Sequence, residues 1–198
     1  MSVFADIDIL NLAEDFPDLI DPFIADRIQP ASYELTLGVG FKFMRESPGD
    51  FPLDVTDKTS AAEAYFEESP DSGDNYFLYP GDFALVTTAE TVHIPDHVVA
   101  HVEGKSSLAR LGLMVHVTAG WVDPGFHGQI TLEVVNLSPR TLLLPIGMKL
   151  AQLAFDNMTG PAARPYGTPG LGSRYQGQSG VGVSQAVDYI DAYLSVAD

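Results

Sequence analysis

The chain has 198 residues and a hydrophobic content of 45%, which suits one globular domain with a substantial core. It contains no cysteine, which excludes disulfides, cysteine-bound zinc and thiol nucleophiles. The net charge of −17 argues against nucleic-acid binding. No apolar run approaches the ~18–20 residues of a membrane span, and no signal peptide is visible. We therefore expect a cytoplasmic protein without a membrane partner.

The N-terminal residues predict a short helix and then a strand. Residues 6–16 carry apolar side chains at helical spacing and begin with Asp6, the expected N-cap. The apolar positions are Ile7, Leu10 and Ala13. Gln29-Pro30-Ala31-Ser32 ends this pattern, and Tyr33–Leu37 alternates as a strand does.

Residues 45–75 are rich in Asp, Glu, Ser, Pro and Gly, and they predict a surface excursion with a helix-compatible patch near Thr59–Glu68. From Tyr76 onward, short apolar runs alternate with turn signals, and Ser106–Leu111 has helical propensity. The expected strands cover residues 77–79, 83–88, 98–102, 129–136, 141–144 and 150–155. Many short strands at roughly even spacing are typical of a sandwich, a jelly roll or a small barrel.

Residues 160–183 are rich in Gly, Pro and Ser and predict a mobile segment. Embedded polar side chains, among them Tyr166, Arg174 and Gln178, suit a segment that closes over a ligand. Ser184 is the expected N-cap of a final amphipathic helix.

The few cations are concentrated in one part of the chain. Residues 101–178 carry six Lys or Arg and four Asp or Glu, whereas the other 120 residues carry 4 and 23. An acidic protein that binds an anion must focus positive charge locally, so this span is the expected ligand site. The acidic remainder fits either a solubilising shell or adaptation to high salt.

Gly104–Arg110 supplies two cations and two hydroxyls within seven residues. If this stretch forms a turn of helix, Ser106 and Arg110 share one face, and the backbone N–H groups at its start can face an anion. A surface helix with a solvated arginine fits the same residues.

Two carboxylates follow at a spacing of ten residues. Glu133 interrupts an apolar strand, and alternation places it with Thr131 on the face opposite Leu132. That face is either solvent-exposed or part of a cleft, where a carboxylate can serve as a base for proton transfer. Asp123 precedes Pro124-Gly125 and is equally expected in an ordinary turn.

The histidines do not predict a metal site. His93 and His97 straddle Pro95, so one helix cannot present both. His116 lies in an apolar run and is expected to be structural.

Taken in order, these segments resemble the dCTP deaminase branch of the trimeric dUTPase superfamily. The resemblance spans about Pro80 to Gln178, half the chain, and Gln29–Ser32 is similar to that family's early strand entry. The stretches that carry it are Val102–Leu113, Thr118–Phe126, Ile130–Glu133, Gly147–Lys149, Arg164–Tyr166 and Tyr175–Gln178.

The resemblance implies a mainly β fold, a distorted jelly-roll barrel with a few short helices. It implies that residues 1–198 form a single domain, with 160–183 as its mobile closing segment. It also implies a homotrimer whose active sites lie between subunits.

By the same resemblance, Glu133 is the base that activates water for attack on C4 of cytosine. Ser106 and Arg110 position that water and the carboxylate, and Asp123 contacts the 3′-hydroxyl region of the sugar. No zinc is implied, although most nucleobase deaminases use one. Mg²⁺ is expected to accompany the triphosphate, and dTTP is a candidate feedback inhibitor.

The resemblance also assigns further substrate contacts. They are Lys105, Ser107, Leu108, Ala109, Thr131, Leu132, Gln152, Tyr166, Arg174 and Gln178. The family pattern often has Lys at the position of Arg174, and the hydrogen-bond geometry of the two cations differs.

The residue after Ala119 separates the branches of the family. Enzymes that release dUTP typically carry His there, whereas bifunctional enzymes that convert dCTP directly to dUMP carry Gly, usually followed by an aromatic residue. This chain reads Ala119-Gly120-Trp121, so we expect dUMP, ammonia and diphosphate as products. We hypothesise that loss of an imidazole beside Asp123 makes room for water.

Three alternatives remain open from the sequence. The first is a monofunctional deaminase that releases dUTP, and the second is a dUTPase without deaminase activity, although plain dUTPases lack a Glu at the position of Glu133. The third is a nucleotide-binding regulator that has lost turnover.

Overall fold

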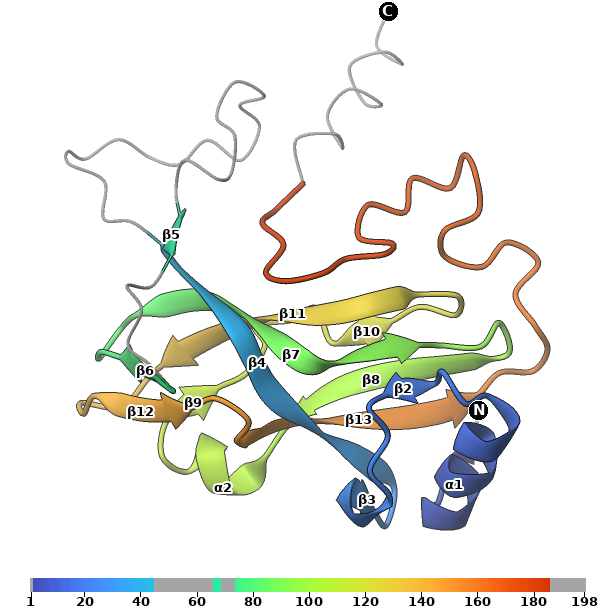
Figure 1. Cartoon of the computed structure of the whole chain (residues 1–198), viewed down its shortest axis with the longest axis horizontal. Helices are drawn as coiled ribbons and strands as arrows, with labels where there is room; N and C mark the ends of the chain where they lie inside the picture. The colour runs from blue at the N-terminus through green and yellow to red at the C-terminus, as the bar shows by residue number, and fades with distance from the viewer. Residues whose placement is uncertain (1, 45–65, 69–73, 186–198) are drawn as a thin grey trace, which may run out of the picture.

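The computed structural model describes residues 2–44, 66–68 and 74–185. Strands dominate these ranges: eleven are joined in one sheet and two form a separate ribbon (Figure 1). The sheet order along its main path is β10-β8-β13-β4-β7-β11-β9. The expected mainly β fold is therefore confirmed. No helix in the described ranges is long and apolar enough to cross a membrane.

The elements follow in chain order. They are β1 (Ser2–Val3), α1 (Asp6–Asp15), β2 (Ile20–Asp21), the 3-10 helix η1 (Ala25–Arg27), β3 (Ile28–Gln29), β4 (Ser32–Met44), β5 (Phe66–Glu68), β6 (Asn75–Leu78), β7 (Phe83–His93), β8 (Val98–Gly104), α2 (Ser106–Ala109), β9 (Leu113–Met114), β10 (Trp121–Val122), β11 (His127–Asn136), β12 (Leu142–Pro145) and β13 (Lys149–Asn157).

Strand β4 connects the two halves of the sheet and crosses the molecule obliquely in Figure 1. Its first half, Tyr33–Thr36, pairs with β13, and its second half, Leu37–Phe43, pairs with β7. The change occurs between Thr36 and Leu37, and at the next residue, Gly38, a Cβ would lie 2.6 Å from the carbonyl oxygen of Thr88. Only glycine permits this approach, and the strand can therefore pass from one group of strands to the other.

Helix α1 forms as expected but presents a different face to the core. Ile9 and Leu12 are buried, whereas the predicted Ile7 is 57% exposed. The N-cap is Ala5 and not Asp6, because the Asp8 carboxylate accepts the Ala5 N–H at 3.0 Å and Asp6 lies within the first turn. The sequence therefore predicted the helix correctly and misplaced its start and its buried side.

Each strand expected after Tyr76 overlaps an observed strand, and the stretch Ser106–Leu111 contains α2. Within the helix-compatible patch at Thr59–Glu68, only residues 66–68 are described, and they form β5, which pairs with β4. The expected final helix lies outside the described residues. Strand β4 is buried on both faces from Ser32 to Gly38, so the alternation at Tyr33–Leu37 did not mark an exposed face.

Candidate functional site

A cavity of about 510 Å³ lies between residues 172–184 and the two successive strands β10 and β11. Its lining includes apolar side chains from β7 and β11 and polar side chains from residues 172–184. Seven of the predicted site residues line it: Ala119, Asp123, Thr131, Glu133, Tyr166, Arg174 and Gln178. One chain therefore brings both predicted carboxylates into a single cavity.

Glu133 reaches the cavity because of strand alternation in β11. Leu132 is buried in the core, while Thr131 and Glu133 are half-buried on the opposite face. The Glu133 carboxylate accepts a hydrogen bond from the backbone N–H of Val117 at 3.4 Å. The face of β11 that carries Glu133 therefore lines a cleft and is not fully exposed to solvent. Leu132, also predicted as a substrate contact, is buried and is not among the residues that line the cavity.

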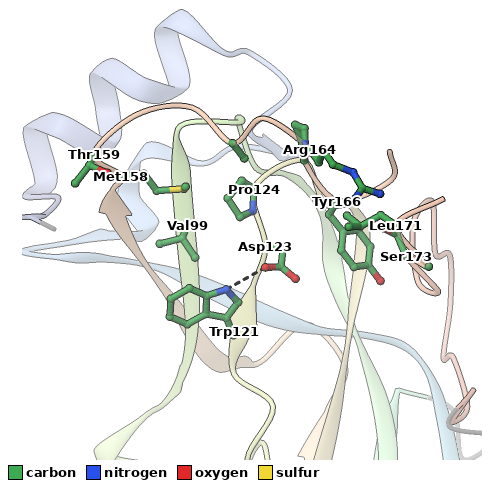
Figure 2. A pocket seen from close by; sticks show the side chains of 13 residues that line it. Val99, Trp121, Asp123, Pro124, Met158, Thr159, Arg164, Tyr166, Leu171 and Ser173 are labelled. Atoms are coloured by element: carbon green, nitrogen blue, oxygen red, sulfur yellow. Dashed lines mark hydrogen bonds between the residues drawn. The ribbon is translucent and has the colours of Figure 1, made fainter. Parts of the chain in front are cut away.

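Asp123 is held at the start of the tight turn that joins β10 to β11. The Phe126 N–H donates to the Asp123 carbonyl oxygen at 3.1 Å, and Gly125 has a φ of +87°. The exposed Asp123 carboxylate accepts the indole N–H of Trp121 at 3.1 Å (Figure 2). A second cavity of about 730 Å³ shares Trp121, Asp123 and Tyr166 with the first, so the carboxylate lies where the two meet.

Hydrogen bonds hold the closing segment against β11 and the turn that precedes it. The Gln178 side-chain amide donates to the Gln129 carbonyl at 3.0 Å and to the Thr131 hydroxyl at 2.7 Å. The Tyr166 N–H donates to the Pro124 carbonyl at 2.7 Å. Figure 1 shows the segment running along the β10–β11 side of the sheet. This position covers the cavity, and the mobility of the segment stays a prediction.

Gln176 also fastens the segment, and the sequence did not assign it a role. Its side-chain oxygen accepts the His127 N–H at 3.1 Å, and its amide donates to the Gly125 carbonyl at 2.9 Å. The signal was its place in the stretch Tyr175–Gln178, in which Gln178 alone was predicted as a substrate contact.

The residues of α2 do not line the cavity. The Arg110 N–H donates to the Ser106 carbonyl at 3.1 Å, so the expected helical turn forms, but Ser106, Ser107, Ala109 and Arg110 are all solvent-exposed. Leu108 packs against the core. In Figure 1, α2 lies at the lower edge, away from β10, β11 and the closing segment. Within one chain, the predicted site residues therefore lie in two separate places, one group at α2 and the other at the cavity.

Next to α2, Lys105 and Lys149 both form ion pairs with the buried carboxylate of Glu34. Gln152, opposite Glu34 in the β13–β4 register, accepts the Ser32 hydroxyl at 2.9 Å and donates to the Gly104 carbonyl at 3.1 Å. Burial is the largest influence on the pKa of Glu34 and acts to raise it, but the hydrogen bonds and charges of the two lysines together lower it below its ordinary value. Sequence reasoning missed Glu34 because its partners are distant in the chain.

Replacing Glu34 with glutamine is expected to lower the stability of the fold at pH 7 by ~1–3 kcal/mol, because the two ammonium groups lose a charged acceptor. The folded-state pKa of Glu34 lies below its unfolded value, so its contribution is present above the unfolded pKa and is lost as pH falls through the folded pKa. Thermal unfolding should therefore show a Tm difference at pH 7 that shrinks towards pH 3. The exposed Glu14→Gln is the control, and a difference of equal size at both pH values would contradict the ionic origin.

Gly120 is placed by the contact between β8 and β10. Its carbonyl accepts the Val102 N–H at 2.7 Å, and a Cβ at this position would lie 2.7 Å from the Val102 oxygen and 3.2 Å from Cε1 of His116. A side chain at position 120 would thus point at Val102 and His116. The structure gives a reason for glycine other than room for water beside Asp123, namely the close approach of two strands.

Comparisons with known proteins agree with this arrangement. The family model described as dCTP deaminase-like matches residues 3–158. A protein of Methanosphaera stadtmanae named dCTP deaminase, dUMP-forming, is 40% identical over 195 residues, which cover 96% of this chain and 97% of the relative. A Haloarcula marismortui protein named dCTP deaminase is 44% identical over 181 residues, which cover 90% and 91%.

A solved structure shows the same fold. The 2′-deoxycytidine 5′-triphosphate deaminase of Agrobacterium tumefaciens superimposes with a TM-score of 0.57 at 24% identity. The match covers 77% of this chain and 46% of that one. The expected barrel-like β fold of the family is thereby confirmed.

Proposed function

The chain belongs to the dCTP deaminase-like family, and from this premise we propose that it is a cytoplasmic hydrolase that converts dCTP and water to dUMP, ammonia and diphosphate. The observation that carries the proposal is the single cavity lined by both Glu133 and Asp123. Two hydrolytic steps on one nucleotide need two positions at which water is oriented, and two carboxylates in one cavity supply them.

In the first step, Glu133 accepts a proton from water as the water oxygen bonds to C4 of the cytosine ring. The same carboxyl delivers this proton to the exocyclic nitrogen, the C4–N bond breaks with its electron pair on nitrogen, and ammonia leaves. The second proton of the water moves from the C4 hydroxyl to ring N3 as the carbonyl forms at C4, which gives dUTP. Ser106 and Arg110 hold the water and the carboxylate in place. No zinc is needed, because the proton transfers use a side-chain base.

In the second step, Asp123 orients water for attack on the α-phosphorus. The water oxygen bonds to phosphorus, the bond from phosphorus to the α,β-bridging oxygen breaks, and diphosphate leaves with the electron pair. The released proton passes to solvent through the exposed Asp123. Mg²⁺ arrives with the triphosphate and neutralises phosphate charge. Among the described residues there is no group of three His, Cys, Asp or Glu side chains that could hold a metal ion.

We further propose a homotrimer in which α2 of one subunit completes the cavity of the next. In one chain, Ser106 and Arg110 lie on a different edge from Glu133 and are exposed, although all three are needed for the first step. Cyclic assembly of three copies would join the two edges at each interface. Lys105, Ser107 and Gln152 would then contact the triphosphate from the neighbouring subunit. dTTP, which shares this triphosphate, is a candidate inhibitor of the same site.

Mixed trimers test this division of the site. Glu133→Gln and Arg110→Ala are each expected to be inactive as homotrimers. After the two are unfolded together and refolded at equal amounts, about a quarter of the sites should combine an intact Glu133 with an intact neighbouring Arg110, which restores deamination. Each variant refolded alone is the control. Recovery no greater than that of the separate variants would place both residues in one subunit's site.

Incubation with dCTP and Mg²⁺ tests the proposed reaction, with nucleotides separated by chromatography and with ammonia and diphosphate quantified. Equal amounts of dUMP, ammonia and diphosphate are expected. Accumulation of dUTP without diphosphate would instead identify a monofunctional deaminase, the candidate favoured by the name of the Haloarcula relative.

Two other outcomes identify the remaining candidates. Cleavage of dUTP with no ammonia from dCTP would indicate a dUTPase, and tight binding of dCTP or dTTP without any product would indicate a regulator.

A further inference from the structure

Trp121 is the only tryptophan of the chain, and its side chain is 56% exposed. It is nevertheless held by two polar neighbours. Its indole N–H donates to Oδ1 of Asp123 at 3.1 Å, and the ring of His101 meets it edge-on at a centroid distance of 4.6 Å and an angle of 89°. Burial of apolar surface does not account for this position, because more than half of the side chain remains in contact with solvent.

The backbone sets the position of the indole. Trp121 lies directly opposite His101 in the β8–β10 pairing, and Nε2 of His101 lies 3.4 Å from a carboxylate oxygen of Asp156 on β13. The missing side chain at Gly120 allows β10 to approach β8 and begin at Trp121. The indole therefore packs against His101 of β8, which in turn lies beside Asp156 of β13. Its N–H is directed at Asp123, as Figure 2 shows.

Asp123 itself is exposed at a turn, where a carboxylate is free to rotate about its side-chain bonds. A bond from the indole to Oδ1 restricts this rotation and leaves Oδ2 available to a substrate group or a water. Trp121 lines both cavities that meet at Asp123, so the indole is placed at the junction where the carboxylate acts.

Building on the proposed function, we propose that Trp121 is a positioning residue for the second hydrolysis. It fixes the carboxylate of Asp123 in the orientation that aligns water with the α-phosphorus. The Glu133 carboxylate accepts its hydrogen bond from the Val117 N–H and not from Trp121. The first step should therefore not depend on the indole N–H. The predicted signature is a change in the balance between the two steps.

Global replacement of tryptophan by 3-benzothienylalanine alters position 121 alone, because the chain has one tryptophan. This analogue keeps the shape of the indole and removes the N–H donor. Hydrogen bonds to charged groups are among the stronger ones, so kcat for conversion of dUTP to dUMP should fall about tenfold or more. Ammonia release from dCTP should stay nearly unchanged, and dUTP should accumulate. Trp121→Phe, which also lacks the donor, should shift the products in the same direction.

Three results would overturn the inference. Unchanged dUMP formation in the analogue-containing protein would show that the donor has no role. An equal loss of both steps would show that the ring acts in folding or in substrate binding in general. A lowered Tm would then indicate folding, and an unchanged Tm would indicate binding. Failure of the unmodified protein to form dUMP from dUTP would overturn the coupled reaction itself, and the inference with it.

Discussion

Replacement of Glu133 by glutamine is expected to abolish ammonia release from dCTP and to leave nucleotide binding nearly unchanged. The amide has the size of the carboxylate and can still accept the hydrogen bond from the Val117 N–H, but it cannot take a proton from water. General acid–base catalysis contributes ~10²–10⁴-fold, so a loss of at least that order is expected. Ammonia measured in a coupled assay and dCTP affinity measured by calorimetry report the two effects separately.

The matched control is Glu14→Gln, which makes the same chemical change at an exposed position of α1. Cleavage of dUTP added directly should continue in the Glu133 variant, because that step uses Asp123. Retention of full deaminase activity by Glu133→Gln would mean that another group is the base.

Replacement of Asp123 by asparagine is expected to separate the two reactions in the opposite sense. The amide oxygen can still accept the Trp121 N–H, so the local structure should persist, but a neutral amide orients water weakly and accepts no proton. Diphosphate release should fall by about 10²-fold, whereas ammonia continues to form and dUTP becomes the product. Chromatography of the nucleotides over time measures this change directly.

Asp26→Asn, an exposed aspartate of η1, is the control for the loss of one negative charge. If Asp123 served only to bind the sugar, ammonia and diphosphate would decrease together in the Asp123 variant. The product ratio therefore distinguishes positioning of water from substrate binding.

The strands that sequence periodicity identified are those long enough to show a pattern. β11 repeats an inward and an outward side chain over ten residues, and its alternation correctly placed Glu133 and Thr131 together. By contrast, β10 has two residues and is defined by its pairing with β8, which no local pattern encodes. The buried face of α1 was mistaken for the same reason, because contacts distant in the chain decide which apolar residues are covered.

The site was predicted in its residue types more fully than in its arrangement. Spacing along the chain does not show that Arg110 and Glu133 end on different edges, since the path of β4 and the position of α2 decide that. Glu34 was missed as a partner because its lysines lie far away in the chain. Trp121 was missed because its bond to Asp123 depends on a side-chain direction that the sequence does not show. The family resemblance suggested the role of each site residue, and the structure shows which side chains contact those residues.

The closing segment also protects a strand edge. β9 pairs with β11 only at Val135 and Asn136, and at Gln129 the outer backbone N–H and carbonyl are instead bonded to Gln178. Unpaired strand edges act as templates for strand addition from other chains. We therefore expect residues 176–182 to protect this edge of β11 against strand addition, and a chain cleaved before Gln176 to expose the unpaired edge beside the cavity.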